Sequence, residues 1–264
     1  AARRTNRVVA ELVAVMQLFS GSMLGLIAPP PALRVAVQAT WRRGDEVSRT
    51  YGPRMMANWD PVRFATTAAF FNAPPSPGEL LKRVLTPPPV RPDGLLWSAE
   101  RPELLEWGPL DDVVMGGVSR STFVTGGSYA TFSGIVTSEN NGGFAGCRSK
   151  ALRPALDLRR FEGLRLRLRG DGNRYKIILR DDYSWNGIAW AFSFDTTNEL
   201  QTIEAPFPAF VPTLFARSVP GKKLDTAGIN TLQLTLSKFE YDSALNPAFT
   251  EGPFRLELEA IEAF

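Results

Sequence analysis

Two polar clusters in this sequence have residue types that could do chemistry. The first pairs Asp111 and Asp112 with Glu139, Asn140 and Asn141, whose carboxylate and amide oxygens are ligands that Ca²⁺ prefers. If the two segments meet in space, they form an oxygen-rich ligand or partner patch. The favoured alternative is two structural turns, in which such side chains accept hydrogen bonds from the backbone.

The second cluster places aromatic rings beside carboxylates, as sugar-binding surfaces do. It runs from Asp181 to Trp190 and includes Tyr183 and Trp185 close to a turn. An exposed ring can stack on a sugar while neighbouring polar groups donate and accept hydrogen bonds. Contact with another protein is favoured over sugar binding, and Trp190 is expected in the core.

The composition excludes most other site chemistry. Histidine is absent from the sequence, which removes histidine-based triads and the common zinc sites. Cys147 is the single cysteine, so a cysteine-ligated metal cluster and an internal disulfide are excluded, and in an alternating strand it is expected to be a small buried hydrophobe. We therefore expect no catalytic residue, no metal and no cofactor, and a protein that is not an enzyme.

The elements that must position these clusters are strands. Three segments alternate apolar with polar residues, as half-buried antiparallel strands do: 164–169, 232–237 and 254–259. Further strands are expected at 121–124, 129–136, 144–148, 175–179, 188–194 and 201–205, separated by turns rich in glycine, asparagine and aspartate. The row of Arg165, Arg167 and Arg169 is expected to be a solvated, paired face rather than a binding surface. About nine short strands predict a mainly β fold, a β-sandwich or jelly roll.

Several of these segments together resemble a known family. The runs DDVVMGGVS at 111–119, ENNGGFAGCRS at 139–149 and RGDGNRYK at 169–176 are similar, in order and spacing, to the signature of the complex I intermediate-associated protein family. The resemblance extends over about residues 97–264. It implies a galactose-binding-like jelly roll, used in known members as an assembly factor for energy-transducing complexes, with no established catalytic residue.

The first 90 residues have a different character and are expected to form an extended N-terminal arm. They hold eleven Lys and Arg against five Asp and Glu, and twelve of the 21 prolines fall before residue 93. One helix is predicted near 7–23 and a second near 77–85. Basic and aromatic residues without a core of their own need another protein's surface. The predicted partner-binding residues of the arm are Trp41, Arg42, Arg43, Tyr51, Trp59, Phe64, Phe70 and Phe71.

Together these features predict a non-catalytic assembly, linker or scaffold protein. Its partners are expected to be protein subunits of a large photosynthetic or respiratory complex, with a plastid antenna such as the phycobilisome as one candidate. The alternative is a carbohydrate-binding module or glycan-active protein. No nucleic-acid partner is expected, and membrane contact is expected to be at most peripheral. The sequence starts at Ala1, which suggests a processed chain, and a plastid is favoured over the mitochondrial matrix.

Overall fold

The computed structural model describes residues 60–72, 93–184 and 187–264. The chain divides into two units between Asp60 and Pro61, and the second, Pro61–Phe264, is compact and contains every element described below. The predicted helices near 7–23 and 77–85 lie outside the described residues. Within the described ranges, no helix is both long and apolar enough to cross a membrane.

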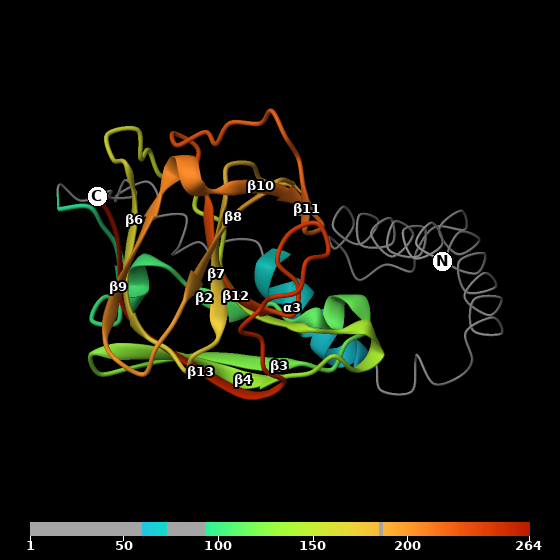
Figure 1. Ribbon diagram of the computed structural model, residues 1–264. Helices are drawn as coiled ribbons and strands as arrows, with labels where there is room; N and C mark the ends of the chain where they lie inside the picture. Colours follow the sequence, from blue (N-terminus) through green and yellow to red (C-terminus); the bar gives the residue numbers. More distant parts are fainter. Residues whose placement is uncertain (1–59, 73–92, 185–186) are drawn as a thin grey trace, which may run out of the picture. The chain divides into compact units, whose positions relative to one another are not determined.

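The strands in the described ranges form two antiparallel sheets that pack face to face (Figure 1). The first sheet runs in the order β3 (Arg120–Gly126), β4 (Tyr129–Val136), β13 (Gly252–Ala263), β6 (Gly163–Arg169) and β9 (Gln201–Pro206), and β1 (Leu95–Ser98) also pairs with β13. The second runs in the order β11 (Arg217–Ser218), β10 (Val211–Leu214), β8 (Ala189–Asp195), β7 (Arg174–Arg180), β12 (Thr231–Ser237), β5 (Phe144–Ser149) and β2 (Trp107–Pro109).

Helical turns are short in the described part of the chain. The helix α3 (Pro61–Asn72) precedes the sandwich, and the 3-10 turns are η2 (Pro102–Leu104), η3 (Asp112–Met115), η4 (Glu139–Asn141) and η5 (Phe207–Ala209). Proline at the first position suits α3, because the first turn of a helix leaves its N–H groups unpaired.

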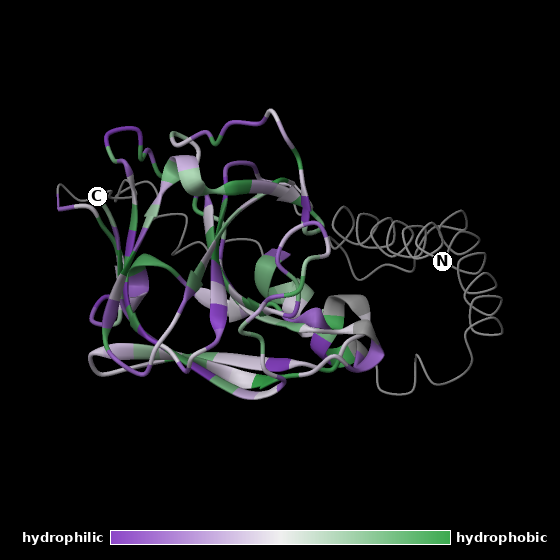
Figure 2. Ribbon diagram, in the orientation of Figure 1, coloured by the Kyte–Doolittle hydropathy of each residue, from purple (hydrophilic) through white to green (hydrophobic). Residues whose placement is uncertain are grey.

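The alternation of side chains decides which face of each strand is buried (Figure 2). In β6, Leu164, Leu166 and Leu168 are fully buried between the sheets, while the arginines between them face outward. The strand β12 is buried on both faces, because its leucines point into the core while Thr231, Gln233 and Thr235 are covered on the opposite face. The second sheet therefore has an outer face that other segments cover.

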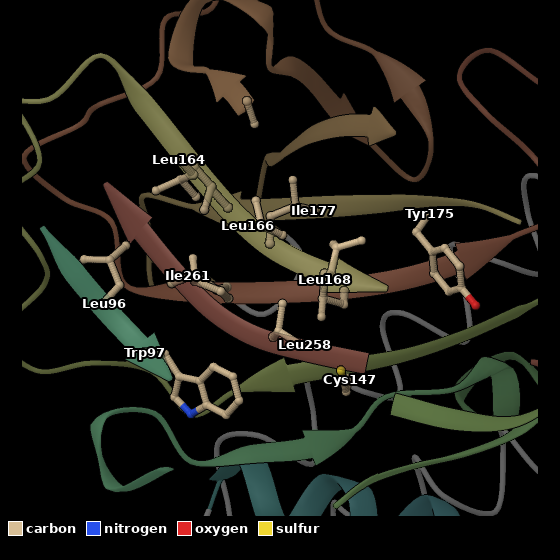
Figure 3. Packing of buried hydrophobic residues seen from close by; sticks show 14 of the residues in the cluster. Leu96, Trp97, Cys147, Leu164, Leu166, Leu168, Tyr175, Ile177, Leu258 and Ile261 are labelled. Atoms are coloured by element: carbon tan, nitrogen blue, oxygen red, sulfur yellow. The ribbon is translucent and has the colours of Figure 1, made fainter. Parts of the chain in front are cut away.

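The core lies between the two sheets and is rich in leucine and aromatic residues (Figure 3). The ring of Phe132 meets the rings of Phe254 and Tyr175 at centroid distances of 5.0 and 6.4 Å. The Tyr175 hydroxyl donates to the Asp171 carboxylate at 3.0 Å, so its polar end stays satisfied at the edge of the core. Each fully buried large side chain stabilises the fold by about 1.5–3 kcal/mol.

The predicted mainly β sandwich is confirmed, and a strand is present at each of the nine predicted positions. The short strands β1, β2, β10 and β11 were not predicted. The helix α3 is a correction. The residues before position 72 show no sustained helical period and no helix was predicted there, yet Pro61–Asn72 is a helix. Contacts with the sandwich, rather than a strong helical pattern, account for its position.

Candidate functional site

Asp112 is a buried carboxylate that holds two signature loops together. It is 0% exposed. Its Oδ1 accepts the Ser119 N–H at 3.0 Å, and its Oδ2 accepts the Ser119 hydroxyl at 2.6 Å and the N–H groups of Gly143 and Phe144 at 2.8 and 3.3 Å. Ser119 directly precedes β3, Gly143 directly precedes β5 and Phe144 begins it, so one side chain fixes both loops at the same end of the sandwich.

Asp111 makes a second set of such contacts and adds the helix α3. Its Oδ1 accepts the Ser121 hydroxyl and the Gly146 N–H, and its Oδ2 accepts the Ser121 N–H and Arg63 Nη2, both at 3.0 Å. The same Arg63 nitrogen donates to the Ser119 carbonyl at 3.1 Å. Burial raises the pKa of Asp111, while these hydrogen bonds and the charge of Arg63 oppose the rise. Asp111 thus joins α3 to both sheets.

The glycines of the signature leave room for these carboxylates. A Cβ atom at Gly117 would lie 2.3 Å from the Asp112 carboxyl carbon, and one at Gly142 would lie 2.4 Å from Asp112 Oδ2. Gly116 and Gly143 have backbone φ angles of +89° and +131°, which residues other than glycine rarely adopt. The glycine pairs and the aspartate therefore form one packed unit.

The structure does bring the two predicted acidic segments together, at the end of the sandwich where η3 and η4 lie. Asn140 adopts a left-handed backbone with φ of 55° in the middle of η4, and Asn141 ends that turn. However, N–H and hydroxyl donors surround all four oxygens of Asp111 and Asp112, whereas a cation needs oxygens that face it. Among the described residues, no group of three or more His, Cys, Asp or Glu is arranged to hold a metal ion.

The helix α3 packs on the outer face of the second sheet through its two adjacent phenylalanines. The ring of Phe70 lies against Gly108 in β2, where an added Cβ would come within 2.3 Å of it. Lys150 Nζ lies 4.7 Å from the Phe70 centroid, and the Arg148 guanidinium lies 5.9 Å from the Phe71 centroid. Cations over aromatic faces add attraction to the packing. One surface therefore combines the aromatic rings of α3 with two cations, Arg148 in β5 and Lys150 directly after β5.

The cations under α3 are held by other residues of the sandwich. Arg148 Nε donates to Gln233 Oε1 in β12 at 2.9 Å, and Lys150 pairs with Glu106 at 2.9 Å. Burial, and to a lesser degree the nearby charge of Arg180, lowers the pKa of Arg148. This surface is the candidate partner-binding site.

The outer face of the first sheet is different, because its charges pair with one another. The three arginines of β6 pair with carboxylates on the two neighbouring strands: Arg165 with Glu204 at 2.7 Å, Arg167 with Glu259 at 3.1 Å and Arg169 with Glu257 at 3.8 Å. Exposed pairs of this kind contribute about 0–1 kcal/mol each. The expected solvated, paired face is what the structure contains here.

Tyr183 lies at the surface with one side of its ring occupied. Its hydroxyl donates to the Leu152 carbonyl at 2.9 Å, and the guanidinium of Arg153 lies 3.9 Å from the ring centroid. Trp190 is buried in the core, as expected. Trp185 lies outside the described residues, so the predicted aromatic pair stays a prediction.

The predicted arm residues fall into two groups. Trp41, Arg42, Arg43, Tyr51 and Trp59 lie outside the described residues. Phe64, Phe70 and Phe71 are half-buried in α3, and the last two contact the sandwich of the same chain, which the sequence analysis did not anticipate. Their role toward another protein stays a prediction. Sequence reasoning also missed Arg63, because nothing near residue 63 indicates a carboxylate 48 positions later.

A comparison with models of protein families matches the sequence of the sandwich to one family. The family model described as Complex I intermediate-associated protein 30 (CIA30) matches residues 97–258, which include both signature loops. No curated protein matches the chain.

Solved structures similar to this chain include carbohydrate-binding modules. The family 11 module of a cellulosomal cellulase of Clostridium thermocellum is 20% identical, with 61% of this chain and 88% of that chain covered and a TM-score of 0.43. The Clostridium thermocellum module in complex with a β-1,3-1,4-mixed-linked tetrasaccharide is 20% identical, with 60% and 88% covered and a TM-score of 0.41. An exo-β-agarase is 13% identical, with 65% and 25% covered and a TM-score of 0.41. None of these similarities transfers a ligand or an activity to this chain.

Proposed function

The chain belongs to the complex I intermediate-associated protein 30 family, and from this premise we propose that it is a non-catalytic assembly or linker protein that binds subunits of a large respiratory or photosynthetic complex. Family membership indicates a role related to complex I assembly, in an organelle and with protein partners. The proposal adds that the N-terminal region and the sandwich bind these partners together.

One observation carries the proposal: the aromatic, basic N-terminal region contributes to the sandwich surface. Phe70 and Phe71 of α3 lie beside Lys150 and Arg148 on the second sheet. Aromatic and arginine side chains dominate the binding energy of protein interfaces. The predicted anchors Trp41 and Trp59 precede this helix in the chain, so the same composition continues toward the N-terminus.

The test is affinity purification of the full-length protein from gently solubilised organelles, with mass spectrometry of what is recovered. We expect the subunits of one energy-transducing complex to be enriched. The double variant Trp41→Ala with Trp59→Ala should reduce their recovery at least about tenfold at any salt, because buried aromatic anchors respond little to ionic strength. Arg42→Ala with Arg43→Ala should slow association mainly at low salt, since exposed charges are screened.

The matched control is Arg167→Gln on the outer face of the first sheet, where the arginine is already paired with Glu259. It should leave recovery unchanged. If no complex subunit is enriched, or if the arm variants recover as much as the control, the proposed function is wrong.

Within this proposal we favour a plastid over the mitochondrial matrix, with an antenna such as the phycobilisome as one complex. Support comes from the charge of residues 1–90, eleven Lys and Arg against five Asp and Glu, because antenna linkers are typically basic. Immunodetection of the native protein in purified plastids and mitochondria tests the location. Detection in mitochondria alone would exclude the plastid assignment.

We also propose that the protein has no catalytic activity. The whole sequence lacks histidine, and burial raises the pKa of its single cysteine, Cys147, so that its thiol is a poor nucleophile. A glycosidase panel and a glycan array test the main alternative. Specific oligosaccharide binding that Trp185→Ala abolishes without loss of folding would support the carbohydrate-binding alternative instead.

A further inference from the structure

Two neighbouring turns beside the edge of the second sheet carry a backbone conformation that their residues disfavour. The hairpin of β10 and β11 turns through Phe215 and Ala216, with φ angles of 51° and 58°. The loop after β12 turns through Asp242 and Ser243, with φ angles of 55° and 70°. Left-handed backbone at residues other than glycine costs about 1 kcal/mol or more each and persists only where surrounding contacts impose it.

Hydrogen bonds between the two turns impose this conformation. The Asp242 N–H donates to the Ala216 carbonyl at 2.9 Å. The Asp242 carboxylate accepts the N–H and the hydroxyl of Ser218 at 2.9 and 2.6 Å. The two turns therefore form one rigid unit, which we name the double turn and which comprises residues 214–218 and 239–245.

The double turn exposes large apolar side chains. Phe215 at the tip of the first hairpin is 56% exposed, and Leu214 beside it is 39% exposed. Phe239 and Leu245 face each other across the second turn and are 40% and 65% exposed. These four exposed apolar side chains lie on two turns that hydrogen bonds join, and we name them the apolar tip. Exposed apolar side chains that gather on a surface mark interaction sites.

The exposed charge around this tip is mainly positive. Residues 211–223 contain Arg217, Lys222 and Lys223, all exposed, and no acidic residue. In the second turn Lys238 adds a cation beside Phe239, at 5.8 Å from its ring.

The two acidic residues of the second turn differ, because Glu240 is buried and Asp242 is exposed. Glu240 is buried and accepts the Ser193 hydroxyl, with Lys176 Nζ 3.8 Å from its carboxylate, and Asp242 binds Ser218. The hydrogen bonds from Ser218 and the charge of Arg217 lower the pKa of Asp242, so this exposed carboxylate offsets one cation. The exposed cations Arg217, Lys222 and Lys223 still leave the double turn and the residues beside it with a net positive charge.

We propose that the double turn docks the protein on the surface of a lipid bilayer that contains anionic lipids. Phe215, Leu214 and Leu245 enter the headgroup region, while Arg217, Lys222 and Lys223 contact the lipid phosphates. Apolar side chains with flanking lysine and arginine are the combination by which peripheral proteins bind such membranes. A bilayer fits better than a second protein because exposed apolar side chains that enter the headgroup region need no complementary pocket.

The test is co-sedimentation of the full-length protein with sucrose-loaded vesicles of phosphatidylcholine alone or with about 30% phosphatidylglycerol, a mixture that supplies the negative surface potential. We expect binding to the anionic vesicles only. Phe215→Asn with Leu245→Gln should weaken the partition at least about tenfold, and asparagine tolerates the left-handed backbone at position 215. Arg217→Gln with Lys222→Gln and Lys223→Gln should weaken it at least about tenfold and remove most of its salt dependence.

Matched controls come from the first sheet. Val124→Thr removes an apolar side chain that is 61% exposed on β3, and Arg167→Gln with Arg169→Gln removes paired cations of β6. Both should bind vesicles like the unchanged protein. Circular dichroism and thermal unfolding show whether each variant is folded, and if the Phe215 variant is not, the charge variant and Leu245→Gln alone decide.

Three results would overturn the proposal. The first is no binding to anionic vesicles. The second is binding that the folded double-turn variants retain within twofold, which would place membrane contact elsewhere in the chain. The third is loss of a protein partner, without any vesicle binding, in the Phe215 variant, which would make the double turn a protein interface.

Discussion

Asp112 has a structural role that depends on its charge and on its shape. Its two oxygens accept four hydrogen bonds from two loops, and it is fully buried. A buried acceptor that loses its donors costs about 1–3 kcal/mol for each unsatisfied group. The end of the sandwich that contains η3 and η4 therefore relies on one side chain.

Asp112→Asn tests this role, because the new amide group places N–H donors against the backbone N–H groups of Gly143 and Phe144. We expect the free energy of unfolding to fall by about 2–4 kcal/mol, measured by urea denaturation. The control is Glu199→Gln, an exposed residue that should change stability by less than about 0.5 kcal/mol. Equal stability of the two variants would mean that the carboxylate is dispensable.

Gly142→Ala tests whether position 142 excludes a side chain because Asp112 leaves no space for it or because the backbone conformation requires glycine. Gly142 has an ordinary φ of −66°, so alanine can adopt its backbone, but the new Cβ would lie 2.4 Å from Asp112 Oδ2. We expect a loss of about 1–3 kcal/mol from overpacking. Gly126→Ala is the matched control, because nothing lies within 4 Å of its added Cβ. If both substitutions cost the same in thermal unfolding, Asp112 is not what excludes a side chain at position 142.

At the scale of elements, α3 is attached to the sandwich near both of its ends. Arg63 near its start binds Asp111, and Phe70 near its end packs on Gly108. A helix of 12 residues is marginal in water without tertiary contacts. Its stability therefore depends on the sheet beneath it.

Phe70→Ala should release α3 while the sandwich stays folded. We expect backbone amides of α3 to exchange with solvent at least about tenfold faster in hydrogen exchange, with β12 unchanged, because local opening needs less free energy than global unfolding. Val62→Ala, at a side chain that is 73% exposed in the same helix, should have little effect. Unchanged exchange in the Phe70 variant would show that other contacts hold the helix.

The sequence predicts elements well where one strand face is apolar and the other polar. The leucines of β6 and β12 alternate over the full strand, so their position follows from the residues alone. The strands β1, β2, β10 and β11 have two to four residues, too few for a period to appear. The helix α3 was missed because its packing depends on Gly108, which no local pattern connects to Phe70.

The same contrast holds at the candidate site. Asp111 and Asp112 stand out in the sequence, and the turn-capping contacts that such residues make were foreseen as the favoured interpretation. Which donors they bind was not predictable, because Gly143 and Arg63 lie 31 and 48 positions away. The pairing of β2 with β5 closes the first separation, and the packing of α3 on the second sheet closes the other.

At the scale of the whole molecule, surface carboxylates give the fold a defined response to acid. The hydrogen bond from Arg174 lowers the pKa of Asp195, and the one from Ser218 lowers the pKa of Asp242. A lowered pKa in the folded state means that stability is present above the unfolded pKa of about 4 and is lost as the pH falls through the folded value. Asp111 has the opposite sign, because its pKa is raised.

We therefore expect the melting temperature to fall as the pH is lowered from about 5 to 3, the range in which the unfolded carboxylates take up protons. Asp195→Asn should make the melting temperature depend less on pH. The change in the free energy of unfolding should be below about 1 kcal/mol, because the pair with Arg174 is largely exposed. Calorimetry at several pH values measures both effects. A slope that is unchanged in the variant would show that Asp195 titrates alike in the folded and unfolded chain.

The position of β13 in the first sheet has a consequence for when the protein can fold. This strand follows all the other described strands along the chain, yet it lies between β4 and β6 and also pairs with β1, and the Ala263 N–H donates to the Gly94 carbonyl. The sheet therefore lacks its centre until the last strand has been synthesised. Pairing of such distant segments also slows folding. A nascent chain cannot complete the first sheet before β13 has been made, and an incompletely folded chain is the state that translocation into an organelle requires.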